Sequence, residues 1–162
     1  MTASFEKAVE IILENEGGYV NNPLDPGGET KYGISKRTYP NIDIKNLTKE
    51  GAKEIYYRDF WMPLKLTNLT DKNLSLHVFD MGVNAGKSRA VKILQKIVMV
   101  PEDGIMGNDT IAAANNSFKD LATLYSNARK EFYTNLAKSG SYSAFLKGWL
   151  NRVLSVDKKK KT

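Results

Sequence analysis

The chain has 162 residues, no cysteine, 41% hydrophobic residues and a formal net charge of +6. Its composition excludes a disordered chain and a disulfide-stapled scaffold, and no apolar run reaches the length of a membrane span. The length suits one domain with a core of its own. The positive charge favours anionic partners, such as polymers of the bacterial envelope or nucleic acid, without choosing among them.

The first apolar pattern predicts a helix that leads to a carboxylate. Thr2 or Ser4 can cap this helix, which runs to about Asn15. At roughly 100° per residue, Glu16 falls inside the apolar stripe of the helix, whereas Glu14 falls on the opposite face. The stripe repeats at helical spacing through Phe5, Ala8, Val9, Ile12 and Leu13.

Glu16 is therefore the candidate general acid. Burial disfavours a charged carboxylate, and so does the negative end of a helix dipole, which the glycines at 17 and 18 place directly after Glu16. A carboxylic acid that stays protonated is what a glycosidase needs to protonate the oxygen of a leaving sugar. The alternative is that Glu16 turns out to solvent as the helix end frays.

A turn-rich segment follows the candidate acid. Asp25-Pro26-Gly27-Gly28 is typical of a turn, and Thr30, Tyr32 and Ile34 alternate with Lys31 and Gly33 as in a short strand. This segment can fold back over the helix end and bring Asp25 and Thr30 towards Glu16. The alternative is that Asp25 only bonds the backbone of its own turn.

These motifs carry a family resemblance. Glu16-Gly17-Gly18-Tyr19, followed by Asp25-Pro26-Gly27-Gly28, Thr30 and Tyr32-Gly33-Ile34, resembles the signature of glycoside hydrolase family 108, the N-acetylmuramidases of phage endolysins and prophage-like secretion cassettes. The resemblance implies that Glu16 is the catalytic acid. The order of a Glu, an Asp nine residues later and a Thr is also similar to the phage-type lysozymes. That similarity implies that Asp25 and Thr30 complete the catalytic set.

Aromatic side chains are the candidate sugar contacts, because aromatic faces stack on sugar rings. Thr48 predicts the start of a helix over 49–61, which Pro63 stops. One face of this helix is apolar and is expected in the core; it carries Ala52, Ile55, Tyr56 and Phe60. Tyr57 and Trp61 lie near that stop. We expect both, together with Tyr19 and Tyr32 of the motif region, to bind substrate; the alternative for Tyr57 and Trp61 is a place in the core.

The next helix, predicted over about 71–84, is apolar on most sides and contains His77 and Asp80. His77 is the only histidine and lacks metal-ligand spacing, so we expect a hydrogen-bonded or surface side chain and no metal site. Asp80 is expected to bond backbone donors or a basic side chain. A helix capped by Ser88 and ending before Pro101 follows.

The turn Asp103-Gly104-Ile105-Met106-Gly107 precedes a helix predicted over 109–114. This turn and the block over about 76–116 resemble the C-terminal segment of family 108 proteins that is described as predicted peptidoglycan-binding. Ser117 and Asp120 resemble a capping box for the next helix, and the last helix carries Trp149 in its core stripe. Lys158 begins a basic tail over 158–162.

We therefore predict a mainly α, lysozyme-like two-lobed helical domain with a small β-hairpin or loop region after the first helix. The single catalytic domain spans 1–157, with a catalytic lobe over about 1–70 and a helical lobe over about 71–157. The expected function is that of an endolysin-type N-acetylmuramidase, which cuts the β-1,4 bond between N-acetylmuramic acid and N-acetylglucosamine. Glu16 is expected to protonate the glycosidic oxygen, Asp25 to stabilise the transition state or activate water, and Thr30 to place that water.

Two alternatives stay open. A lytic transglycosylase uses the same acid on the same bond, and a non-catalytic wall-binding or secretion-accessory protein fits the basic charge. We expect no cofactor, no nucleic-acid partner, no stable membrane insertion and a monomer, with peptidoglycan strands and anionic envelope polymers as partners. The sequence shows no signal peptide, so we expect synthesis in the cytoplasm and release to the wall by a separate pore such as a holin.

Overall fold

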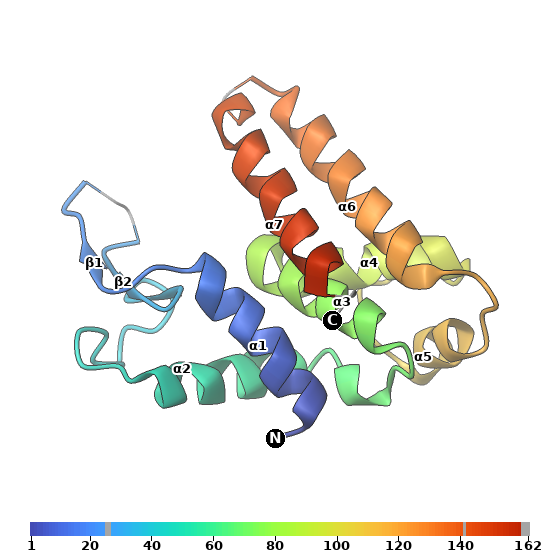
Figure 1. Cartoon of the computed structure of the whole chain (residues 1–162), viewed down its shortest axis with the longest axis horizontal. Coiled ribbons are helices and arrows are strands. Elements are labelled where there is room, and N and C mark those ends of the chain that lie inside the picture. Colours follow the sequence, from blue (N-terminus) through green and yellow to red (C-terminus); the bar gives the residue numbers. More distant parts are fainter. Residues whose placement is uncertain (25–26, 141, 160–162) are drawn as a thin grey trace. The chain divides into compact units, whose positions relative to one another are not determined.

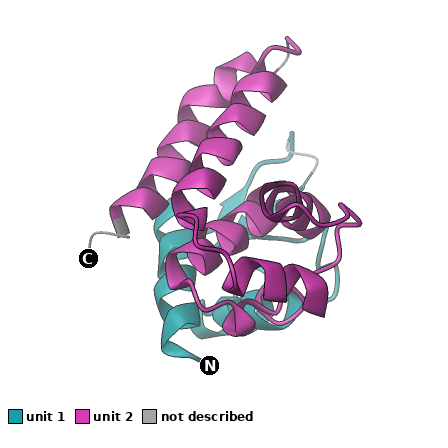
Figure 2. Cartoon of the chain, turned by 90° about the vertical axis from the view of Figure 1, so that its right-hand side faces the viewer, with its two compact units in different colours: residues 1–59 teal, residues 60–162 magenta. Residues whose placement is uncertain are grey.

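The computed structural model describes residues 1–24, 27–140 and 142–159. In these residues the fold is mainly helical, with seven α-helices and one small antiparallel sheet (Figure 1). This confirms the predicted mainly α, lysozyme-like class with a small β region after the first helix. The chain divides into two compact units, residues 1–59 and 60–162 (Figure 2).

Helix α1 (Ala3–Asn15) carries the candidate acid at its end. The Thr2 hydroxyl accepts the Phe5 N–H at 3.2 Å, so Thr2 rather than Ser4 is the cap. Leu13, which the pattern placed in the apolar stripe, is only half-buried, whereas Ile11 is buried. The buried face consists of Phe5, Ala8, Val9, Ile11 and Ile12.

Three short strands follow in the order β1 (Val20–Asn21), β2 (Glu29–Lys31) and β3 (Ile34–Ser35). Both neighbouring pairs are antiparallel, with Thr30 opposite Val20 in β1 and opposite Ser35 in β3. Ile34 is buried and anchors the sheet in the unit. The alternation of residues 30–34 predicted one short strand; in the structure this segment is instead the end of β2, a two-residue turn at Tyr32 and Gly33, and the start of β3.

Helix α2 (Lys49–Tyr56) begins at Thr48, whose hydroxyl accepts the Gly51 N–H at 3.0 Å, as predicted. Lys53 lies 3.2 Å from carboxylate oxygens of both Glu6 and Glu10 on α1. These ion pairs are partly exposed, so each contributes little on its own. They nevertheless link α2 to α1 within the first unit.

The helix predicted over 49–61 changes its character at residue 57. A π-helical turn, η1 (Tyr57–Trp61), replaces the last α-helical turn. A π turn inserts one extra residue and rotates every later side chain relative to the α-helical pattern. This rotation changes the direction of the side chains after Tyr56, including that of Trp61.

The second unit is built around α3 (Lys72–Ala85), a helix with an almost continuously buried middle. The rings of Trp61 and Phe79 pack edge-on, with their centres 5.4 Å apart. The Leu64 side chain packs so closely on Gly82 that a Cβ there would stand 2.9 Å from Leu64 Cδ1. The residues before α3 thus belong to its core. For this reason the division falls at 59/60, earlier than the lobe boundary near 70 that the sequence predicted.

The remaining elements of this unit are α4 (Lys87–Val98), α5 (Asn108–Asn115), α6 (Leu121–Ala137) and α7 (Leu146–Lys159), with 3-10 turns η2 (Leu66–Asn68) and η3 (Ser143–Phe145). Helices α6 and α7 lie side by side as an antiparallel pair (Figure 1). None of the described helices is long and apolar enough to cross a membrane.

Two helix caps differ from the prediction. Helix α4 starts two residues earlier than a cap at Ser88 predicts, with Gly86 at the cap at φ +101. Helix α6 is capped by Asp120 alone, since its carboxylate accepts the Thr123 N–H at 3.2 Å. Trp149, predicted in the core, is half-buried and stacks between Tyr133 and Phe145.

Candidate functional site

Glu16 stands where α1 ends. Its N–H still donates to the Ile12 carbonyl at 2.9 Å, but its backbone is extended, with φ −101 and ψ 133. Neither Gly17 nor Gly18 has a positive φ, so no left-handed glycine ends the helix. The side chain of Glu16 is half-buried, whereas that of Glu14 is exposed. The predicted difference between these two faces of the helix is therefore present.

A tight hairpin between β2 and β3 reaches the end of α1. Lys31 pairs with Ile34, and the two residues between them, Tyr32 and Gly33, have φ +54 and φ +79. Two positive φ values define a type I′ turn, which matches the twist of the flanking strands. A tyrosine in this left-handed conformation is strained, and such strain persists only where the surroundings hold it.

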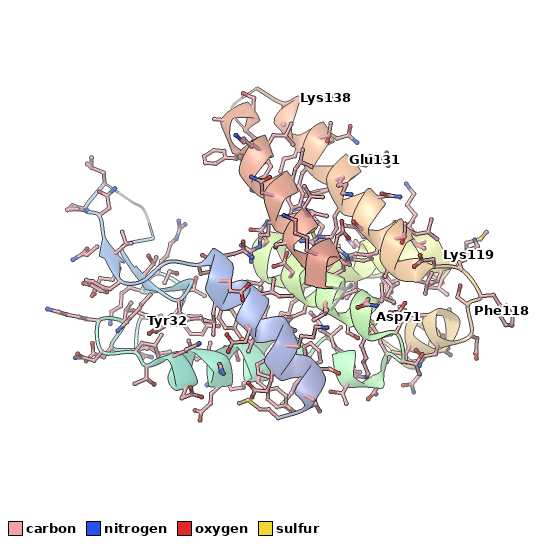
Figure 3. All side chains as sticks on the ribbon, in the orientation of Figure 1. Tyr32, Asp71, Phe118, Lys119, Glu131 and Lys138 are labelled. Carbon is pink, nitrogen blue, oxygen red and sulfur yellow. The ribbon has the colours of Figure 1, made fainter. Side chains whose placement is uncertain are left out.

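Two hydrogen bonds hold the Tyr32 backbone. Its N–H donates to the Gly17 carbonyl at 3.2 Å, directly after the candidate acid. Its carbonyl accepts the Tyr56 hydroxyl of α2 at 2.7 Å. The hairpin tip is thus bonded both to the segment after α1 and to α2, and Tyr32 lies beside β2 in Figure 3.

Gly33 packs directly on the candidate acid. A Cβ atom at this position would stand 2.9 Å from Cγ and 3.2 Å from Cδ of Glu16, and 2.4 Å from the Tyr56 hydroxyl. Glycine is therefore required twice, by the positive φ and by the close approach. The Glu16 side chain lies against the hairpin, so the alternative of a frayed helix end does not describe this structure.

Thr30 lies in β2, three residues before Gly33. Residues that face each other in an antiparallel pair share one face of the sheet, so Thr30 shares its face with Val20 and Ser35. Its side chain is half-buried. The structure thus places Thr30 on the same small sheet whose tip contacts Glu16.

Tyr19 is partly exposed beside this sheet, and its hydroxyl donates to a Glu29 carboxylate oxygen at 2.7 Å. That hydrogen bond raises the pKa of Tyr19. The ring remains open to a ligand while its hydroxyl is fixed. Glu29 is a third carboxylate in the motif region, after Glu16 and Asp25. The sequence did not single it out, because only the pairing of β1 with β2 shows that it lies next to Tyr19.

The predicted carboxylate partner, Asp25, lies outside the described residues. In the chain it falls between β1 and β2. Among the described residues, nothing lies within 4 Å of a Cβ built on Gly17 or on Gly18. Because their backbone needs no glycine either, these two positions leave open space directly after Glu16.

The two aromatic residues near the end of α2 pack against other aromatic side chains. Tyr57 packs edge-on against Phe5 at 5.0 Å, in the first turns of α1 rather than the last. Trp61 is only 1% exposed, and its indole N–H donates to the Thr67 hydroxyl at 2.9 Å. The structure corrects the expectation for Trp61, because a ring needs an open face to stack on sugar.

Tyr56 is the residue of the site that the sequence assigned to the core alone. It is 1% exposed, so its place in the apolar face of α2 is correct. Its hydroxyl, however, lies at Gly33 beside Glu16. The available signal was chemical: a tyrosine on an apolar helix face needs a partner for its buried hydroxyl.

A second group of ionisable side chains lies buried in residues 60–162. Asp80 is paired with Arg129 and accepts the Arg152 Nε–H at 2.9 Å, as expected for a carboxylate that bonds basic side chains. Arg129 also lies 2.9 Å from His77 Nδ1, and His77 Nε2 lies 3.0 Å from Asp157. This network joins α3, α6 and α7. In the described residues no cluster of three His, Asp or Glu side chains is placed to hold a metal.

Burial, together with the neighbouring Arg129 guanidinium, lowers the pKa of His77 to about 4. The unfolded chain has the ordinary value near 6.5 and binds the proton first as pH falls. We therefore expect full stability above pH 6.5 and a loss as pH falls towards 4, up to about 3 kcal/mol from this group. The contribution of His77 is measured by comparing the free energy of unfolding in urea for the wild type and His77→Gln between pH 7 and 4.5. An equal loss in both proteins would contradict the prediction.

Comparison with known proteins supplies the family context of these features. The family described as glycosyl hydrolase 108 matches residues 9–86, and the one described as predicted peptidoglycan domain matches residues 89–154. Among solved structures, SagA from Brucella abortus is 34% identical with a TM-score of 0.82, over 98% of this chain and 92% of that one. No curated protein sequence matches the chain.

Proposed function

Since this chain belongs to the glycosyl hydrolase 108 family, a family of glycoside hydrolases, we propose that it is an N-acetylmuramidase. Its partner is peptidoglycan, in keeping with the second matched segment. The bond cut is the β-1,4 bond between N-acetylmuramic acid and N-acetylglucosamine, and the activity is of the lysozyme type. The observation that carries the proposal is the position of Glu16. Its side chain lies at the end of α1 against Gly33, which the Tyr56 hydroxyl also approaches, and the next two residues, Gly17 and Gly18, have free space around them among the described residues.

Glu16 acts in this proposal as the general acid. It donates a proton to the glycosidic oxygen as the bond to the leaving sugar breaks. The half-buried position and the close approach of Gly33 restrict the positions open to the Glu16 side chain. A fixed acid is effective because its orientation is established before the reaction begins.

Asp25 and Thr30 complete the proposed set. Asp25 stabilises the positive charge that develops on the sugar ring or takes a proton from the attacking water, and Thr30 helps to place that water. Tyr19, whose partly exposed ring lies beside the same sheet, is the best supported of the proposed sugar contacts. Tyr32 supports the site through its backbone whether or not its ring meets the sugar.

The test is digestion of purified peptidoglycan by the purified protein, followed by turbidity and by mass spectrometry of the products. A muramidase yields products with a reducing muramic acid end. Products that end in an anhydro sugar would replace hydrolysis with the transglycosylase reaction. Binding to sacculi without any soluble product would point to a non-catalytic wall-binding protein.

For Asp25 we expect Asp25→Asn to lower kcat on the order of 10²-fold with little change in KM. Asparagine makes the same turn-stabilising backbone bonds as aspartate, so this substitution removes the charge and is compatible with the turn that the sequence predicts. Steady-state kinetics on soluble glycan strands, with circular dichroism to verify folding, measures the effect. Normal turnover in Asp25→Asn would return Asp25 to a purely structural role.

We also propose that the enzyme acts on the wall outside the cytoplasmic membrane after release by a separate pore such as a holin. The net charge of +6 and the basic tail over 158–162 support attraction to anionic envelope polymers, which salt weakens. Fractionation of producing cells before and after permeabilisation checks this placement. Lytic activity in the medium of intact cells would contradict it.

A further inference from the structure

Three adjoining cavities surround the start of α4 and the loop over 99–107 in the second unit. The first, of about 540 Å³, is lined by Gly86, Lys87, Ser88, Arg89 and Lys92. The second, of about 270 Å³, shares Lys87 with the first, and the third, of about 200 Å³, shares Ile105 with the second. We call this series of cavities the α4 groove.

The first end of the α4 groove is basic. Lys87 Nζ lies 5.5 Å from the centre of the Phe60 ring, and the Arg89 guanidinium lies 4.9 Å from the centre of the Phe132 ring. These cation–π contacts orient the two side chains. Within the described residues, neither Arg89 nor Lys92 has a carboxylate within 4.0 Å. Their charge is therefore available to an anionic group of a ligand.

The middle of the α4 groove is mainly apolar, although Lys65 and Lys87 also line it. Side chains of Pro63, Val91, Ile105 and Met106 line the second cavity. Ile105 is 67% exposed, an unusual state for a large apolar side chain in a loop that is otherwise well anchored. This part of the groove suits small apolar groups such as methyls.

The far end of the α4 groove is acidic. Asp103 and Asp109 line the third cavity together with Asn108 and Thr110. The Ile105 N–H, which donates to Asp103 at 2.9 Å, lowers the pKa of this carboxyl group, so Asp103 is ionised at neutral pH. The two ends of the groove thus carry opposite charges.

The loop that joins the two ends is rigidly built. Buried Gln95 donates to Asp103 Oδ1 at 2.8 Å and accepts the Gly104 N–H at 3.0 Å. Gly104 has φ +77, and a Cβ there would stand 2.3 Å from the Ser88 hydroxyl. Only glycine lets the loop pack this closely on the start of α4. The α4 groove is therefore formed before any ligand binds.

We propose that the α4 groove binds the peptide stem of peptidoglycan. Such a stem is a short peptide that carries carboxylates, alanine methyl groups and, on its diamino acid, a free ammonium group. The carboxylate meets Arg89 and Lys92, the methyl groups meet Ile105 and its apolar neighbours, and the ammonium group meets Asp109. The opposite charges of the two ends set the direction of the peptide. The choice of ligand rests on the proposed function.

The test is an NMR titration of the wild-type protein with a sugar-free stem tetrapeptide that contains a diamino acid. We expect about twofold to fivefold weaker binding in the double variant Arg89→Gln/Lys92→Gln and in Asp109→Asn, the scale of partly exposed charge pairs. We choose Asp109 for substitution rather than Asp103, because Asp103 accepts hydrogen bonds from Gln95 and from the Ile105 N–H that stabilise the loop. Lys96→Gln, which removes an exposed charge from the same helix outside the α4 groove, is the matched control and should bind as the wild type does.

A second peptide, acetylated on its free amino group, tests the direction. It should bind more weakly to the wild type and no longer distinguish the wild type from Asp109→Asn. Absence of tetrapeptide binding, or equal binding by all variants, would overturn the proposal. The tetrapeptide has no glycosidic bond, so its binding is measured independently of cleavage. If the wild type cleaves peptidoglycan but does not bind the tetrapeptide, only the proposed role of the α4 groove is refuted. If the wild type binds the tetrapeptide but does not cleave peptidoglycan, the proposed hydrolase activity is refuted.

Discussion

Glu16→Gln is expected to abolish lysis of purified peptidoglycan, with kcat lowered on the order of 10²- to 10⁴-fold. Glutamine has nearly the same shape as glutamate but cannot deliver a proton. The site can accept it, because the contacts that seat Glu16 on Gly33 involve the Cγ and Cδ atoms, which glutamine keeps. The fold and the binding of sacculi should therefore change little.

The measurement is the initial rate of turbidity loss and of reducing-end formation, with wall binding measured by co-sedimentation. Glu14→Gln is the matched control, since it removes a carboxylate two residues earlier on the exposed face of the same helix. This control should retain the wild-type rate. More than a tenth of wild-type activity in Glu16→Gln, in a folded protein, would remove Glu16 from the role of acid.

The position of Glu16 was predictable because it depends on local physics. Helical periodicity sets which face of α1 each residue occupies, and Thr2 sets where the helix starts. The alternation of residues 30–34 likewise indicated the β region, although the turn that divides it into β2 and β3 was not predicted. What these patterns cannot supply is the contact between them, because Gly33 meets Glu16 only after the hairpin has folded back.

Trp61 shows how a local irregularity in a helix changes which side chains enter the core. The spacing of Ala52, Ile55 and Tyr56 assumes 3.6 residues per turn, but η1 inserts an extra residue after Tyr56. The later side chains rotate, and Trp61 enters the core against Phe79. No composition or spacing rule announces such a π turn in a single sequence.

Ser88 shows a different limit. As a serine before an apolar pattern it predicts a helix cap. In the structure its hydroxyl lies under Gly104 instead, because the loop from residue 103 packs on α4 and Gly86 provides the start of the helix. A long-range contact therefore overrides a sound local preference, and the same contact creates the α4 groove.

Gly33→Ala is expected to lower kcat on the order of 10²-fold, the scale associated with a displacement of about 1 Å in a reacting group. The new Cβ would stand 2.4 Å from the Tyr56 hydroxyl and 2.9 Å from Glu16 Cγ. The Tyr56 hydroxyl is held by the Tyr32 carbonyl at 2.7 Å, so the Glu16 side chain is the part that can move. Its displacement takes the acid away from the position in which it protonates the substrate.

Strain at the positive φ of Gly33 also lowers stability, by roughly 1 kcal/mol, and this effect must be separated from the loss of catalysis. Gly140→Ala is the matched control: its φ is +90, and among the described residues nothing lies within 4 Å of its Cβ. It should lose similar stability and keep its kcat. The double variant Gly33→Ala/Tyr56→Phe removes the hydroxyl that the new methyl group meets, so it should regain part of the lost turnover. Wild-type kcat in Gly33→Ala, measured with urea unfolding on the same samples, would show that the hairpin does not position Glu16.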